Sequence, residues 1–348
     1  MRRLAPLLLL TLAACSTVNP YYDPAVAHRG RDGFHNNYPA AREGSYWVWQ
    51  WQRWRDGLPH PPQNGYRFPM ATVQTAYLQS NRTEPSVTWI GHASVLLQIG
   101  GLNILADPHF GERASPLSFA GPRRKVPPGL DFSQLPHVDA VVISHNHYDH
   151  LDTGTVKRLA AQAGGSPRFY VPLGLRKWFN DEGIADVVEL DWGESREQSG
   201  VKIHCVPVQH WSKRTLTDRD QTLWAGWVFE HPTLRAFFAG DTGYSKDFAD
   251  IGRRFGSFDF AAIPIGAYEP RWFMQPYHVN PVEAVQIFED LHARTALGIH
   301  WGTFELTDES LDEPPRALAR ALREKSIPPE RFFVLKHGET RRLSQAQR

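Results

Sequence analysis

The sequence predicts a layered α/β fold in which two β-sheets are covered by helices. Short runs of β-branched and aromatic residues recur between residues 87 and 299, and helical patterns lie between several of them. Hydrophobic residues make up 41% of the 348 residues, which is ample for a sizeable core. That length would allow two domains, but one large α/β unit with an N-terminal arm fits equally well.

The first 14 residues have the form of a bacterial lipoprotein signal. Met1-Arg2-Arg3 is charged, and the apolar stretch from Leu4 to Leu12 is too short to span a bilayer. The end of this stretch, Leu12-Ala13-Ala14-Cys15, resembles a lipoprotein cleavage box. We therefore expect a lipid-modified Cys15 and a location in the cell envelope, and Ser16 favours the outer membrane. The alternative is an ordinary signal peptide followed by a chance cysteine.

Residues 15–80 are expected to form an N-terminal arm. Its first part, residues 16–40, is rich in Asn, Pro, Tyr and Gly and is typical of a tether leading away from a membrane. A tryptophan-rich segment follows, in which Trp47, Trp51 and Trp54 share one face at helical spacing. Such a face either packs on the main body or contacts lipid headgroups, and the commoner use of aromatic faces favours packing.

The main domain is expected to cover residues 81–345. The predicted strands are 87–90, 95–99, 102–106, 139–143, 169–171, 187–190, 201–206, 223–229, 234–239, 260–263 and 296–299. The predicted helices are 154–163, 173–181, 281–292 and 314–324.

Bulk composition excludes some partners and cross-links. The formal net charge is +1 at pH 7, so no nucleic acid partner is expected. The only cysteines are Cys15 and Cys205, and a lipid on Cys15 would leave Cys205 without a partner. Cys205 lies in a strand-like run and is expected to be a small buried hydrophobic residue.

Metal-ligand side chains follow the predicted strand 139–143. Residues 144–153 read Ser-His-Asn-His-Tyr-Asp-His-Leu-Asp-Thr, with three His and one Asp between positions 145 and 150. In extended backbone His145 and His147 share a side and can bind one ion, while Asp149 and His150 can reach a second. A solvated polar loop or one structural zinc site are the alternatives. Asp152 or Thr153 is expected to cap the next helix.

Three further ionisable residues each follow an apolar run at a predicted strand end, namely His210, Asp241 and His300. One alone would usually be an ordinary polar residue. Together with the histidine-rich loop they predict a two-metal hydrolytic centre.

Six stretches resemble one branch of the metallo-β-lactamase superfamily, the N-acylphosphatidylethanolamine-hydrolysing phospholipase D branch. The similarity runs from about Val87 to about Glu339, and the run Arg271-Trp272-Phe273-Met274 marks the branch. The six stretches are 88–93, 144–152, 209–215, 238–244, 264–274 and 300–304. Tyr277 departs from the Gln of the animal enzymes, and the signal and cleavage box have no counterpart there.

The resemblance implies a four-layer αβ/βα sandwich, two zinc ions and often a homodimer. By position, His145, His147 and His210 would hold one zinc ion, Asp149, His150 and His300 would hold the other, and Asp241 would bridge them. Asp149, Asp241 and His278 would act in catalysis, with His278 orienting substrate or handling a proton.

The substrate class expected from this resemblance is a membrane phospholipid. Arg271, Trp272, Phe273 and Met274, with Tyr277, are the expected substrate contacts, because a cation among apolar side chains suits a phosphate headgroup beside acyl chains. The alternative is a buried loop in which Arg271 forms a salt bridge. We expect phospholipase D-type cleavage to a phosphatidic acid and an N-acylethanolamine. Alternatives are a lactonase or carboxylic esterase, or a non-catalytic zinc-binding envelope lipoprotein.

Overall fold

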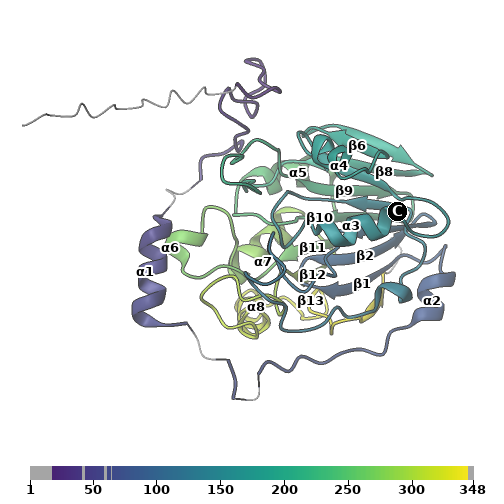
Figure 1. The fold of residues 1–348 in the computed structure, drawn as a ribbon. Coiled ribbons are helices and arrows are strands. Elements are labelled where there is room, and N and C mark those ends of the chain that lie inside the picture. Colours follow the sequence, from purple (N-terminus) through teal and green to yellow (C-terminus); the bar gives the residue numbers. More distant parts are fainter. Residues whose placement is uncertain (1–17, 41–43, 59–60, 64, 344–348) are drawn as a thin grey trace, which may run out of the picture.

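Two seven-stranded sheets form the centre of the protein in a computed structural model that describes residues 18–40, 44–58, 61–63 and 65–343. The predicted signal and Cys15 lie outside the described residues. The strand order is β14-β1-β2-β3-β4-β5-β6 in the first sheet and β13-β12-β11-β10-β9-β8-β7 in the second. Figure 1 shows the sheets stacked at the centre, with helices around them.

In the first sheet, neighbouring strands are antiparallel from β14 to β3 and parallel from β3 to β6. The second sheet is antiparallel from β7 to β10 and parallel from β10 to β13. The strands of the first sheet are β1 Ser86–Gly91, β2 Ser94–Ile99, β3 Leu102–Ala106, β4 Ala140–Val142, β5 Arg168–Pro172, β6 Val187–Leu190 and β14 Thr340–Arg342. Those of the second are β7 Ser195–Gln198, β8 Val201–Val206, β9 Gly226–His231, β10 Leu234–Phe238, β11 Phe260–Pro264, β12 Thr295–Ile299 and β13 Phe332–Phe333.

Alternation along the strands divides the apolar side chains between two cores. On β2, Val95 and Leu97 face the core that both sheets share, whereas Leu96 belongs to a second core outside the first sheet. The helices over this outer core are α2 Thr75–Ser80, α3 Thr153–Ala160 and α4 Arg176–Asp181. As predicted, Asp152 caps α3, accepting a hydrogen bond from the Thr155 backbone N–H.

The second sheet is covered by α5 Asp247–Phe255, α7 Pro281–Asp290 and α8 Glu313–Glu324. The predicted αβ/βα sandwich is therefore confirmed. Two further helices, α1 Tyr46–Asp56 and α6 Arg271–Met274, lie together at one side of the sheets (Figure 1). Within the described ranges, no helix is both long and apolar enough to cross a bilayer.

The predicted elements are recovered with shifted ends, and those missed are mostly short or polar. The strand predicted at 223–229 begins only at Gly226. The Ser-Arg-Glu-Gln sequence of β7 and the Thr-Arg-Arg sequence of β14 have no apolar alternation, and each is a strand because it pairs with a neighbour. Helices α2, α5 and α6 and strand β13 were also not predicted.

Residues 18–40 lie against the main body, which differs from the predicted tether. His28 Nε2 and Arg29 Nη2 contact the Asp191 carboxylate at 2.7 and 2.5 Å. Farther along, Asn37 Nδ2 donates to Asp247 Oδ1 at 2.9 Å. Composition rich in turn-forming residues did not distinguish a free spacer from an irregular segment fixed by side-chain hydrogen bonds.

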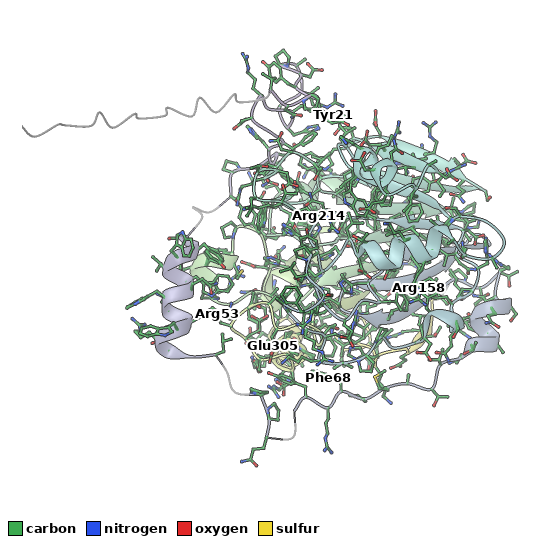
Figure 2. All side chains as sticks on the ribbon, viewed as in Figure 1. Tyr21, Arg53, Phe68, Arg158, Arg214 and Glu305 are labelled. Atoms are coloured by element: carbon green, nitrogen blue, oxygen red, sulfur yellow. The ribbon has the colours of Figure 1, made fainter. Side chains whose placement is uncertain are left out.

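Helix α1 docks on the body, but not through the predicted face. Trp49 is buried, stacks on Phe273 with ring centroids 4.8 Å apart, and donates to Asp308 Oδ2 at 2.8 Å. Arg53 lies on the same side and pairs with Asp308 at 3.1 Å (Figure 2). The face of Trp47, Trp51 and Trp54 is exposed. The prediction that this face packs on the body is therefore wrong.

Asp191→Asn should loosen the N-terminal arm. The folded protein depresses the pKa of Asp191, because hydrogen bonds and charge from His28 and Arg29 outweigh the effect of burial. Removing this charge should lower the free energy of unfolding by about 1–3 kcal/mol. Chemical denaturation measures this loss, and limited proteolysis should cut first within residues 18–35. Unchanged stability and unchanged cleavage would contradict the role of this clamp.

Candidate metal centre

The predicted ligands gather at the edge where strands of both sheets end. His145 to His150 follow β4, His210 follows β8, Asp241 follows β10, and His300 follows β12. Parallel strands that neighbour one another release their loops at the same edge, so these residues, distant in sequence, become neighbours. The structure brings all seven predicted ligands together.

One group consists of His145, His147 and His210. Each offers a ring nitrogen, and the three atoms lie within 4.8 Å of one another. His145 Nε2 lies 2.8 Å from His147 Nδ1, and His210 Nε2 lies 3.3 Å from that same nitrogen. Three imidazole nitrogens this close together form a set that a zinc ion with a further ligand can use.

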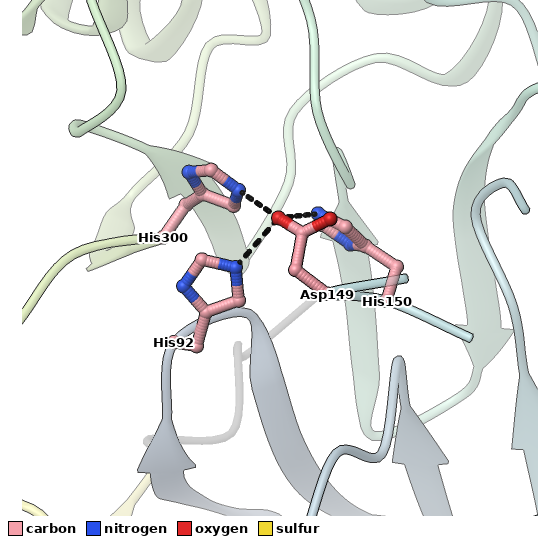
Figure 3. Close-up of side chains that lie close together, drawn as sticks. All are labelled: His92, Asp149, His150 and His300. Carbon is pink, nitrogen blue, oxygen red and sulfur yellow. Dashed lines mark hydrogen bonds and ion pairs between the residues drawn. The ribbon is translucent and has the colours of Figure 1, made fainter. Parts of the chain in front are cut away.

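A second group centres on Asp149, as Figure 3 shows. Asp149 Oδ2 lies 3.4 Å from His150 Nε2, 3.3 Å from His300 Nε2 and 3.0 Å from His92 Nε2. His92 comes from the turn between β1 and β2 and was not among the predicted ligands. Its position just past an apolar strand is the same signal that identified the other ligands.

Asp241 lies between the two groups. One carboxylate oxygen is 3.1 Å from His150 Nε2, and the other is 3.1 Å from His300 Nε2. His210 Nε2 is 4.0 Å away, and His278 Nδ1 is 3.9 Å away. Asp241 therefore lies within reach of histidines from both groups, and His278 stands beside it.

The outer nitrogens of three of the histidines have hydrogen-bond acceptors. His150 Nδ1 donates to Asp107 Oδ2 at 2.7 Å, and His210 Nδ1 donates to the Tyr277 carbonyl at 3.0 Å. His145 Nδ1 lies 2.9 Å from Ser144 Oγ, which itself donates to Asp107 at 2.5 Å. Such partners fix the tautomer and direct the other ring nitrogen into the site.

The backbone around the site is tightly turned. His92, Asp107, Ala267 and His300 have φ values of 52°, 40°, 63° and 62°, a region that non-glycine residues seldom adopt. Gly240, with φ 63°, lets the chain before Asp241 approach the first sheet, where a Cβ atom would lie 2.4 Å from Ser144 Cβ. The backbone that carries the ligands is therefore held in conformations that are unfavourable for non-glycine residues.

Unpaired buried atoms and the pattern of charge both fit a metal. His150 Nε2 and Asp241 Oδ1 face the site and are buried without a hydrogen bond, their contacts there being ion pairs only. Neighbouring imidazoles hold the pKa of Asp241 well below its usual range despite burial, so this buried carboxylate is charged. Buried anions surrounded by imidazole nitrogens form a cation site.

A cavity of about 530 Å³ opens over this centre. His147, Asp149, Asp241 and His278 are at its base, and Lys213 and Arg219 contribute cations to its wall. Apolar side chains complete it, among them Tyr46, Trp49, Phe273, Met274 and Tyr277. A volume and a mixed lining of this kind are usual for a small-molecule site.

A family profile described as the beta-lactamase superfamily domain matches residues 102–301. The chain belongs to the metallo-β-lactamase superfamily. It is 47% identical over 238 residues to N-acyl-phosphatidylethanolamine-hydrolyzing phospholipase D 1 of Caenorhabditis elegans, covering 65% of this chain and 67% of the nematode protein. The mitochondrial protein of that name from Saccharomyces cerevisiae is 37% identical, covering 66% of this chain and 50% of the yeast protein.

These relatives identify the branch within the metallo-β-lactamase superfamily as the one resembling N-acylphosphatidylethanolamine phospholipase D. A solved isothiocyanate hydrolase from Delia radicum gut bacteria shares the fold, with a TM-score of 0.60, 22% identity, and coverage of 74% of this chain and 99% of that chain. Family and site together make the protein a metal-dependent hydrolase of this superfamily.

Two residues predicted to contact the substrate, Arg271 and Trp272, do not line the cavity. Arg271 donates to both Glu283 carboxylate oxygens, at 3.0 and 2.8 Å, and to the His278 carbonyl at 2.8 Å. A half-buried guanidinium needs such partners, so Arg271 orients the segment that carries His278. Trp272 is exposed and does not line the cavity. The cations at the cavity wall, Lys213 and Arg219, were not predicted.

The N-terminal arm forms hydrogen bonds directly with one candidate metal ligand, His210. Asn36 Nδ2 donates to the His210 carbonyl at 2.9 Å, and the His210 backbone N–H donates to Asn36 Oδ1 at 3.1 Å. Trp224 Nε1 also donates to Asn36 Oδ1, at 3.0 Å. The Asn36 side chain thus fixes the His210 backbone by donating one hydrogen bond and accepting another. No local sequence pattern indicated this contact.

Asn36→Ala should weaken metal binding at the His145–His147–His210 group. Loss of an outer partner commonly costs roughly 10- to 100-fold in metal affinity. Competition with a chromophoric chelator measures that affinity. Asn37→Ala is the matched control, because Asn37 donates to Asp247 and not to a metal ligand. Equal losses in both variants would show that the effect is only structural.

The two groups should bind metal with different pH dependence. Burial and neighbouring imidazoles lower the pKa of His147 to about 4 and those of His145 and His210 well below 6.5. Burial alone would also lower the pKa of His300, but Asp241 and Asp149 raise it to about 9, and the pKa of His150 is likewise held well above 6.5.

A bound metal requires neutral imidazoles, so binding at the Asp149–His150–His300 group must release protons at neutral pH. Affinity there should rise between pH 6.5 and 8.5, about tenfold per unit for each proton displaced. The other group should change little over that range. Calorimetric metal titrations in buffers of different ionisation enthalpy measure both quantities. Equal dependence of metal affinity on pH at the two groups would contradict the raised pKa values of His150 and His300.

Proposed function

We propose that the protein is a di-zinc phosphodiesterase of the phospholipase D type. Its substrate would be N-acylphosphatidylethanolamine or a related membrane phospholipid, cleaved to a phosphatidic acid and an N-acylethanolamine. One observation carries the proposal: buried metal-ligand clusters form the base of a cavity whose walls combine apolar side chains with Lys213 and Arg219. The names of its relatives in C. elegans and yeast support the same chemistry.

Zinc suits the ligands because imidazole nitrogen and carboxylate oxygen are its usual donors. We propose two ions, one at His145, His147 and His210 and the other at Asp149, His150 and His300, with Asp241 between them. Zinc bound at such a site acts as a Lewis acid and lowers the pKa of bound water. The remaining steps depend on what the chain itself contributes.

The cavity wall would bind and orient a phosphodiester. Lys213 and Arg219 would offset its negative charge, and Trp49, Phe273 and Met274 would contact acyl chains. Burial lowers the pKa of His278 to about 4, so its imidazole is neutral at neutral pH. His278 would therefore hold or pass on a proton beside Asp241 rather than arrive already charged.

We further propose that Cys15 carries a lipid that anchors the protein in the bacterial cell envelope, at the outer membrane. The motif at residues 12–15 supports this anchor. We also propose a homodimer, for which the family resemblance is the support. An anchored hydrolase would meet its phospholipid substrate within the same membrane.

Zinc-loaded protein should convert N-acylphosphatidylethanolamine to phosphatidic acid, detected by mass spectrometry. Asp241→Asn should lower the rate by more than about 100-fold, beyond the usual effect of losing an outer-shell partner. Asp186→Asn is the control, because this carboxylate pairs with Arg168 at the surface. Metal content and circular dichroism would be recorded for each variant.

Absence of phosphatidic acid from protein with both metals bound would contradict the proposal. A parallel panel of lactones and carboxylic esters would then identify the second candidate, because such esters would be hydrolysed faster than any phosphodiester. A bound metal without turnover of either class would indicate a non-catalytic zinc-binding lipoprotein.

A further inference from the structure

Four segments with exposed apolar or cationic side chains line the cavity, together with Leu306 and Thr307. They are α1, the loop of residues 112–125, the loop of residues 213–220, and α6. Each contributes lining residues to the cavity, namely Tyr46 and Trp49, Ala114, Lys213 and Arg219, and Phe273 and Met274. We call these four segments the rim.

The rim holds the most exposed apolar side chains of the described residues. Those more than three-quarters exposed are Leu216 at 92%, Trp54 at 82%, Trp47 at 79% and Phe119 at 78%, and all lie on the rim. Trp51 and Trp272 on α1 and α6 are also exposed. Large apolar side chains gathered around a site mark an interaction surface.

The rim is also positively charged. Residues 112–125 contain four cationic side chains and one acidic one, although the whole chain has a net charge of only +1. The other three segments each hold more cationic than acidic residues. On α1 the Arg55 guanidinium lies over the Trp51 ring, 4.6 Å from its centroid. Three of these cations, Arg53, Lys125 and Arg271, pair with Asp308, Glu305 and Glu283 outside the four segments. A cationic excess remains on the rim after these pairs are counted.

We propose that the rim docks on the headgroup layer of an anionic lipid bilayer and presents the cavity mouth to it. Trp and Arg side chains together favour the membrane interface, and cationic segments are attracted to anionic lipid. A second copy of the chain fits less well. In a two-fold dimer through the rim, cationic surfaces would face one another and the cavity mouths would be covered.

This docking surface would deepen the proposed function, which requires access to membrane phospholipid, but its position does not depend on the predicted anchor. The side chains of α1 that would meet the membrane are not those that hold the helix on the body. Trp47, Trp51 and Trp54 are exposed, whereas Trp49 and Arg53 contact the body. The three exposed tryptophans can therefore be removed without disturbing the contacts that hold α1 on the body.

The test uses the chain from residue 18, which holds every contact described above and omits the predicted lipid anchor. Its sedimentation with vesicles would be compared for the parent and the Trp47→Ala/Trp51→Ala/Trp54→Ala variant. Vesicles would contain phosphatidylcholine alone or with about a third of phosphatidylglycerol. The parent should bind the anionic vesicles more strongly, and raised ionic strength should weaken this binding.

The triple variant should bind at least about tenfold more weakly, since three indole side chains leave the interface. Met70→Ala, which removes an exposed apolar side chain that does not line the cavity, is the control and should bind like the parent. Circular dichroism and hydrolysis of a soluble short-chain phosphodiester should be unchanged in the triple variant.

Equal vesicle binding by parent and triple variant would overturn the inference. So would loss of a dimer in the variant without loss of vesicle binding, which would make the face a contact between copies. Vesicle binding is measured without turnover, so an absence of phosphodiesterase activity would contradict the proposed function and leave the docking result standing.

Discussion

Asp149 and Asp241 are carboxylates placed among imidazoles at the edge where both sheets end, and the structure around them depends on balancing their charge. Burying an unpaired carboxylate is costly, so each must meet positive charge in the folded state. In the metal-free protein that charge comes from protons on His150 and His300, whose pKa values are raised. A metal can replace those protons, so charge balance links metal binding to pH.

Ligand geometry in turn depends on groups outside the site. Asp107 orients His150 directly and His145 through Ser144. Asn36 performs the corresponding task for the backbone of His210 from 174 positions earlier in the chain. The N-terminal arm is therefore part of the scaffold of the centre, and loss of its contacts would reach the metal through one pair of hydrogen bonds.

The surroundings of the centre explain how a widespread fold can serve a particular substrate. Sheets and metal ligands recur in hydrolases that act on unrelated substrates, so selectivity must arise from the cavity and its rim. Here α1 and α6 add aromatic surface at the mouth, and Lys213 adds a cation inside it. An apolar wall, an interior cation and an exposed tryptophan face would together suit the phospholipid that we propose as substrate.

From local spacing and apolar periodicity the sequence by itself predicted the layered fold and the cluster of ligands. The family branch followed from the resemblance of its motifs to a known family, and the lipoprotein motif remains a prediction. Only the tertiary structure decided that His92 joins the ligands, that Arg271 pairs with Glu283, and that Trp49 rather than Trp47 docks α1. Such contacts join residues far apart in the chain. Which partner a side chain meets depends on strand order and loop path, and neither is encoded in the local pattern around that residue.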